Sequence, residues 1–370
     1  MLRKTLIILF LQTVILTACR AASTPAPTAP KIQPAEQATE APAATEPPPP
    51  PPPTEPIATP TQGGPSAEDI SSLTPVILSM GFVPNVQFAP FYVAVDKGYF
   101  AGQGLSVEFD YGMEHDLLQL VGTGKRQFVV GSGDQVILAR SQGLPVVYVM
   151  NWYRRFPIVI FSVADLTRPQ DLVGKTVGLP GLFGASYIGW QALLNATGID
   201  PEQVNVETIG FTQAEAVAAG KVDVAVGYAM NEPIRLQQEG YAPSVIEVAD
   251  YIDLVANGII TNETTVEENP DLVQRVVTAS LLGLRDTIAD PEEAFEITLN
   301  YVPEAGDQRE AQLAVLKKSI EYWEADQPGY SDPAAWEASQ QFLKDVSLIE
   351  QTTDVDQMFT NRFVEAAQLQ

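Results

Sequence analysis

The side chains that usually carry catalysis are scarce in this chain of 370 residues. It has one cysteine and one histidine, so no disulfide can form within the chain, and Cys/His zinc sites, Cys–His dyads and iron–sulfur clusters are excluded or nearly so. The many carboxylates show no paired-acid or EF-hand spacing, although an all-carboxylate calcium or magnesium site stays open. They are interpreted as a solvated surface, and no catalytic or metal-binding residue is predicted.

Amide, hydroxyl and aromatic side chains gather instead where the expected strands end. Such groups bind small molecules through hydrogen bonds and ring contacts, and the carboxyl ends of strands are the usual place for them in α/β folds. We therefore expect a ligand-binding site composed of Asn85, Gln87, Phe88, Ser132, Asp134, Gln135, Trp152, Tyr153, Phe183, Tyr187, Tyr228, Asn231, Glu232 and Asn257.

Some of these residues allow a second interpretation. Trp152 and Tyr153 can stack on a ligand or pack between lobes, and the sequence favours neither. The glycine loop at residues 181–186 can cradle an anion at a helix N-terminus, but a plain tight turn is the favoured interpretation. Arg154 and Arg155 can pair with a sulfonate or phosphate, yet surface ion pairs are favoured in so acidic a chain.

Strands and helices must alternate to position these residues. Short apolar runs alternate with helical periodicity from residue 74 onward, and the pattern is helical after residue 270. This predicts an α/β fold with two lobes, each a mainly parallel sheet with helices on both faces, and a ligand cleft between the lobes. Strands are expected at residues 75–79, 106–110, 128–131, 146–151, 158–163, 176–179, 204–209 and 222–227.

The expected domain organisation begins with an N-terminal targeting signal. Arg3 and Lys4 precede an apolar core at residues 6–16, and the segment ending at Cys19 resembles the bacterial lipoprotein cleavage region. Residues 1–19 are thus expected to be a signal peptide. Cys19 is expected to carry acyl chains that anchor the protein to the cell membrane on its extracytoplasmic face. A disordered proline-rich tether (20–73), lobe 1 (74–164 plus 262–370) and lobe 2 with the crossings (165–261) are expected to follow.

The charge balance limits the partners. The formal net charge of −25 disfavours nucleic acid and anionic lipid surfaces, because a body this acidic repels phosphates. No nucleic-acid partner is therefore expected.

Two segments point to a family. Residues 81–104 (GFVPNVQFAPFYVAVDKGYFAGQG) and 171–178 (DLVGKTVG) resemble the periplasmic solute-binding proteins related to thiamine-pyrimidine synthesis and uptake. The resemblance covers nearly all of residues 74–365. It implies the type II periplasmic-binding-protein fold and a receptor that closes on a small ligand and delivers it to an ABC permease and its ATPase. A monomer is expected, and no cofactor is expected.

The branches of this family differ in ligand. The synthase branch carries a cysteine-rich motif and an active-site histidine, neither of which fits a chain whose single His115 lies elsewhere. The pyrimidine-binding branch has an Asn-His pair after the first strand, where this chain has residues 85–88 without histidine. Residues 84–92 (PNVQFAPFY) resemble the riboflavin-binding branch, and a flavin needs the aromatic faces and amide partners that the strand ends supply.

Riboflavin is therefore the favoured ligand, and vitamin uptake is the favoured role. A thiamine pyrimidine precursor and an aliphatic sulfonate are the alternatives within the receptor class. An enzyme acting on a small metabolite in the inter-lobe cleft is the alternative of another class, which a nucleophile, metal or perturbed base in the cleft would favour.

Overall fold

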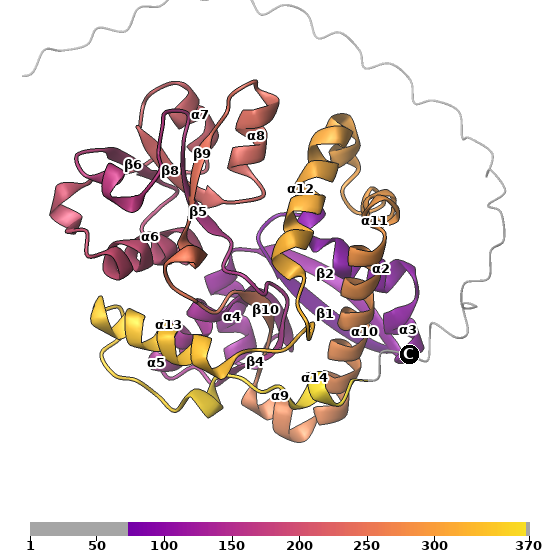
Figure 1. Ribbon diagram of the computed structural model, residues 1–370. Coiled ribbons are helices and arrows are strands. Elements are labelled where there is room, and N and C mark those ends of the chain that lie inside the picture. Colours follow the sequence, from indigo (N-terminus) through magenta and orange to yellow (C-terminus); the bar gives the residue numbers. More distant parts are fainter. Residues whose placement is uncertain (1–72, 368–370) are drawn as a thin grey trace, which may run out of the picture. The chain divides into compact units, whose positions relative to one another are not determined.

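The computed structural model describes residues 73–367 of the chain. The predicted signal peptide, Cys19 and all but the last residue of the predicted tether lie outside the described residues. The described residues form two five-stranded sheets with helices packed against both of them (Figure 1). The predicted α/β class is confirmed.

The first sheet has the strand order β2-β1-β3-β10-β4. Strand β1 pairs in parallel with β2 and β3, whereas β10 pairs antiparallel with β3 and β4. One strand of this sheet therefore runs against the other four, so the sheet is mainly parallel, as predicted. Its strands are β1 (Thr74–Gly81), β2 (Leu105–Gly112), β3 (Phe128–Ser132), β4 (Val146–Asn151) and β10 (Asn257–Asn262).

The second sheet repeats this plan with the order β7-β6-β8-β5-β9. Here β6 pairs in parallel with β7 and β8, and β5 pairs antiparallel with β8 and β9. The central strands of both sheets are apolar and buried, because helices cover them. The strands are β5 (Ile158–Ser162), β6 (Thr176–Leu179), β7 (Asn205–Thr208), β8 (Val224–Tyr228) and β9 (Ser244–Glu247).

These pairings show that both segments where the chain crosses between the lobes lie earlier in the sequence than predicted. The prediction kept residues 158–163 in lobe 1 and assigned residues up to 261 to lobe 2. In the structure, β5 already belongs to the second sheet and β10 has already returned to the first. The crossings are therefore residues 152–157 and 248–256. The error arose because an apolar run shows that a strand is buried but not which sheet it joins.

The longer helices are α2 (Ala89–Asp96), α4 (Glu114–Gly122), α5 (Gly133–Ser141), α6 (Gly184–Thr197), α7 (Gln213–Ala218), α10 (Pro270–Ala289), α11 (Pro291–Thr298), α12 (Arg309–Trp323) and α13 (Pro333–Asp345). The short helices are α3 (Tyr99–Gly102), α8 (Glu232–Gln238), α9 (Glu263–Glu268) and α14 (Arg362–Glu365). The helices α10 to α14 confirm the helical pattern expected after residue 270. No helix among residues 73–367 is both long and apolar enough to cross a membrane.

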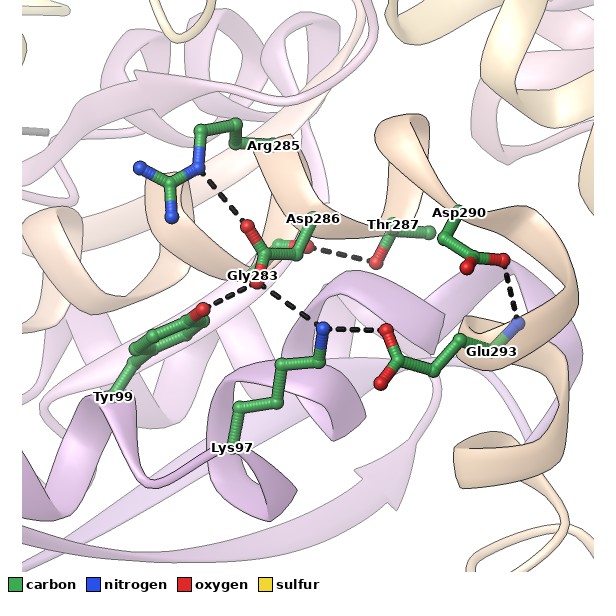
Figure 2. A network of polar contacts seen from close by, with 8 residues as sticks. All are labelled: Lys97, Tyr99, Gly283, Arg285, Asp286, Thr287, Asp290 and Glu293. Atoms are coloured by element: carbon green, nitrogen blue, oxygen red, sulfur yellow. Dashed lines mark hydrogen bonds and ion pairs between the residues drawn. The ribbon is translucent and has the colours of Figure 1, made fainter.

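A polar network ties the N-terminal helices to the C-terminal helical tail (Figure 2). Lys97 Nζ lies 3.3 Å from Asp286 Oδ2 and 2.6 Å from Glu293 Oε2. The Tyr99 hydroxyl donates to Asp286, which also accepts from Arg285 Nε at 3.0 Å. Residues 97–100 (KGYF), part of the first segment that carries the family resemblance, thus join α2 and α3 to α10 and α11.

Candidate functional site

A cavity of about 460 Å³ lies between the two sheets. This volume is within the range of roughly 300–1,000 Å³ that is usual for small-molecule sites. Residues that follow the carboxyl ends of strands in both sheets form its wall, together with the first crossing segment. The predicted residues found in this wall are Asn85, Gln87, Phe88, Gln135, Trp152, Tyr153, Phe183, Tyr228, Asn231, Glu232 and Asn257.

Three predicted residues lie outside the wall. Ser132 and Asp134 are fully buried behind it, where the end of β3 turns directly into α5. Tyr187 lies one turn into α6 and is half-buried against the core. A strand-end position thus brings a residue near the cavity, but the local turn decides whether its side chain reaches it.

The sequence analysis also missed part of the wall. Most of the missed residues end or follow strands β1, β2, β6 and β7, whereas Val130 lies within β3. Applying the strand-end argument to every strand could have found all of them except Val130. Ser186, which lies at the start of α6 beside Phe183 and Tyr187, is part of the wall although the predicted site does not include it. The missed residues are Gly81, Phe82, Met113, Glu114, His115, Val130, Pro180, Gly184, Ala185, Ser186, Phe211 and Gln213.

Trp152 is a packed aromatic residue. Its ring centroid lies 5.8 Å from that of Phe88, 5.2 Å from Phe91, 4.7 Å from Tyr153 and 5.4 Å from Trp323. The side chain is 3% exposed, so protein rings already occupy its surroundings. Its indole Nε1 has no hydrogen-bond partner among the described residues. This leaves an unsatisfied donor in the cavity wall, and such groups are rare in protein interiors.

Other rings of the wall have open faces. Phe183 is 51% exposed, Phe211 57% and Phe82 40%, although all three are large apolar side chains. Phe82 of the first lobe and Phe211 of the second contact each other with ring centroids 5.4 Å apart. Exposed apolar rings beside a cavity are available to cover a flat ligand.

A chain of hydrogen bonds connects the two lobes through the cavity wall. The hydroxyl of Tyr153, in the first crossing, donates to Gln87 Oε1 at 2.9 Å. Gln87 Nε2 then donates to Asn231 Oδ1 at 3.0 Å. Gln87 lies on the 3₁₀ helix η1 (Val86–Phe88) of the first lobe, and Asn231 precedes α8 of the second. Asn257 Oδ1, also in the wall, is buried without a partner among the described residues.

Glu114 places a buried carboxylate in the first lobe's part of the wall. It is the first residue of α4, and its Oε1 accepts from the backbone N of Ser132 at 2.6 Å and from Ser132 Oγ at 2.7 Å. Burial, reinforced by the nearby charge of Asp134, raises the pKa of Glu114 to about 7. Burial also raises the pKa of Asp134 to about 6. Both groups therefore titrate near neutral pH.

Glu232 provides a matching carboxylate in the second lobe. It begins α8, accepts from the backbone N of Tyr228 at 2.8 Å, and burial raises its pKa to about 7. A Cβ on Gly131 would lie 2.9 Å from Glu114 Oε1, and one on Gly227 would lie 2.4 Å from Glu232 Oε2. Each carboxylate thus packs against a glycine near the end of a central strand, β3 in the first sheet and β8 in the second.

The wall contains no lysine or arginine among the residues that the structure describes. His115 is in the wall, but its side chain is 62% exposed and lies 3.3 Å from Asp116. Arg155 Nη2 instead pairs with Glu247 at 2.7 Å and Asp250 at 2.5 Å, which confirms the surface ion-pair interpretation. Within residues 73–367, no group of three or more His, Cys, Asp and Glu residues is arranged to hold a metal ion.

The two mainly parallel sheets, the two crossings and the cavity between them define the fold of a periplasmic binding protein. The periplasmic aliphatic sulphonate binding protein SsuA from Escherichia coli superposes with a TM-score of 0.63 at 14% identity, over 80% of this chain and 95% of that one. At this identity the likeness concerns the fold alone.

The chain belongs to the NMT1/THI5-like family, whose model matches residues 85–294. It is 44% identical to the riboflavin-binding protein RibY of Chloroflexus aurantiacus, over 84% of this chain and 92% of that protein. It is 30% identical to the formylaminopyrimidine-binding protein of Halalkalibacterium halodurans, over 80% of this chain and 92% of that protein. The resemblance found in the sequence is thereby confirmed, and both relatives are named as binding proteins.

Proposed function

We propose that this protein is the solute-binding component of an ABC importer and that its ligand is riboflavin. The observation that carries the proposal is the character of the cavity wall, which combines open aromatic faces with amide groups and no basic residue. A flavin ring is flat and largely neutral, and it offers donors and acceptors along one edge to such groups. The 44% identity to a protein named as riboflavin-binding supports this ligand.

The same wall argues against an aliphatic sulfonate. A sulfonate needs a cationic partner or a helix N-terminus. Among the described residues the wall has no lysine or arginine, and two of its helices, α4 and α8, begin with the carboxylates Glu114 and Glu232. A neutral thiamine pyrimidine precursor is compatible with this charge pattern and is the second candidate, supported by the relative that binds formylaminopyrimidine.

In this proposal Phe183 stacks on the ligand, because its ring is half-exposed, whereas Trp152 is enclosed by protein rings, and its buried indole N–H would donate to the ligand only once the lobes close around it. The remaining predicted wall residues supply amide and hydroxyl contacts from both lobes. Contacts to both lobes favour the closed arrangement, which the permease would recognise. The crossings 152–157 and 248–256 would serve as the hinge.

The test is a calorimetric titration of the purified protein with riboflavin. We expect saturation at one ligand per chain, and we expect Phe183→Ala to weaken the affinity about tenfold, the order of magnitude of a lost aromatic stacking contact. Tyr241→Ala is the matched control, because Tyr241 is an exposed aromatic residue of the same lobe outside the wall. Absence of riboflavin binding by the folded protein would refute the ligand assignment.

The titration also separates a receptor from an enzyme. Glu114 and Glu232 have the raised pKa values that a general base often shows, so an enzyme remains the alternative of another class. Ligand recovered after incubation should have an unchanged mass. A converted product would contradict the receptor role.

The location is part of the proposal. Lipidation of Cys19 would hold the chain on the extracytoplasmic face of the membrane, with residues 20–73 as a spacer. Cys19→Ser expressed in a bacterial host should move the protein from the membrane fraction to the soluble fraction. Retention of the variant in the membrane would contradict the anchor.

A further inference from the structure

We propose that Glu114 and Glu232 select the charge of the ligand, so that the cavity accepts a neutral flavin and rejects the same flavin carrying a phosphate. The inference rests on the proposed function and goes beyond it, since it names the chemical feature by which close relatives of the ligand are told apart. One of these two residues comes from each lobe, and both belong to the cavity wall.

Neither carboxylate is free to swing away from an approaching anion. Glu114 is held by two donors of Ser132, and Glu232 is held by the backbone N–H of Tyr228. The glycines beneath them leave room for this close approach, because a Cβ at either position would collide with a carboxylate oxygen. The negative charges are therefore fixed features of the wall.

The surroundings of Glu114 do not neutralise it. Asp134 faces it from the start of α5 and adds negative charge, and Ser132 contributes only neutral donors. On its own helix, the neighbouring His115 is exposed and faces Asp116. From the second lobe, Tyr228 faces Glu114 as a neutral phenol, whose pKa is held well above its usual range by burial and by the negative charge of Glu114.

Glu232 is compensated only in part. Arg235 of the same helix acts favourably on it, but Arg235 Nη2 is already paired with Glu215 at 2.8 Å, and Glu215 opposes that effect. Helix N-termini attract anions, and the wall contains those of α4, α6, α7 and α8. The helices α4 and α8 begin with Glu114 and Glu232 themselves, so only α6 at Gly184 and α7 at Gln213 begin with an uncharged residue. Each helix terminus is equivalent to about half a positive charge, so these two together amount to less than two ionised carboxylates.

Binding of a phosphate in the cavity carries one of two penalties. Either the phosphate is repelled by the ionised carboxylates, or the carboxylates must first take up protons. For a carboxyl group whose pKa is about 7, proton uptake at pH 8 lowers the affinity about tenfold, whereas at pH 6 it lowers the affinity hardly at all. A neutral ligand meets neither penalty. Discrimination against the phosphate should therefore increase as the pH rises.

The experiment compares the dissociation constants of riboflavin and riboflavin 5′-phosphate, measured by calorimetry at pH 6 and pH 8. For the wild-type protein we expect the phosphate to bind at least tenfold more weakly at pH 8, with a gap several-fold smaller at pH 6. Glu114→Gln and Glu232→Gln should each narrow the gap at pH 8 several-fold. Glu108→Gln and Glu207→Gln are the controls, because they remove an exposed charge from each lobe outside the wall.

Equal affinity of the wild-type protein for both flavins at pH 8 would overturn the inference, and so would a gap that both wall variants leave unchanged. If the folded protein binds neither flavin, the proposed ligand is wrong. In that case the neutral 4-amino-5-hydroxymethyl-2-methylpyrimidine and its phosphate form the matched pair. The ratio of their two dissociation constants at pH 8 then tests the role of the carboxylates.

Discussion

Replacing Glu114 with glutamine should stabilise the protein, and the gain should grow with pH. Both hydrogen bonds from Ser132 end on one oxygen, Oε1, so the glutamine side-chain oxygen can accept both while the charge disappears. In the folded protein burial raises the pKa of Glu114 from 4.5 to about 7. Between these values the folded protein keeps a proton that the unfolded chain has released, so the free energy of unfolding falls as pH rises.

The expected magnitude follows from this pKa difference. Each pKa unit corresponds to about 1.4 kcal/mol, so Glu114→Gln should raise the free energy of unfolding by about 1 kcal/mol at pH 5 and about 3 kcal/mol at pH 8. Urea unfolding at both pH values measures this change in the free energy of unfolding. Glu108→Gln is the control, because the Glu108 side chain is exposed. An equal gain at both pH values, or a loss at pH 8, would refute the buried-carboxylate reasoning.

Three further predictions concern other parts of the structure. Gly227→Ala should lower the free energy of unfolding by about 1–3 kcal/mol in urea, because the new Cβ would lie 2.4 Å from Glu232 Oε2; unchanged stability would contradict this close contact. Asp286→Asn should cost about 1 kcal/mol of stability but leave riboflavin affinity unchanged, since the Lys97 network lies outside the cavity wall; weaker binding would contradict that separation. Trp152→Phe should weaken riboflavin binding about tenfold in a calorimetric titration, because the packed ring is kept while the indole donor is lost; unchanged affinity would show that the donor does not serve the ligand.

The sequence predicted strands well where burial dictates their composition. The bounds of β4 and β6 agree with the prediction, because each is a short apolar run between clear turn residues. The short elements α8 and β9 were missed, since so few residues show no period. Membership of β5 and β10 in a sheet was also beyond the sequence, because pairing partners are chosen in three dimensions.

The cavity wall was predictable as a set of strand ends, but the burial and the contacts of each side chain were not. The sequence left Trp152 open between stacking and packing, and only the positions of Phe88 and Trp323 show that it is enclosed. Glu114, on helix α4, was missed because its importance comes from a contact with Ser132, which lies at the end of β3. Such features depend on contacts between segments far apart in the chain.

The position of β10 between β3 and β4 has a consequence for how the protein is made. Among the described strands, β4 pairs with β10 and with no other, and its side chains are almost completely buried. A ribosome or an export channel releases the chain from its N-terminus, so β4 emerges long before its partner and exposes apolar residues in the meantime. All strands of the second sheet, by contrast, lie within one continuous stretch, residues 158–247. The sheet that begins first is therefore completed last, and β4 has no strand to pair with until the returning strand β10 arrives.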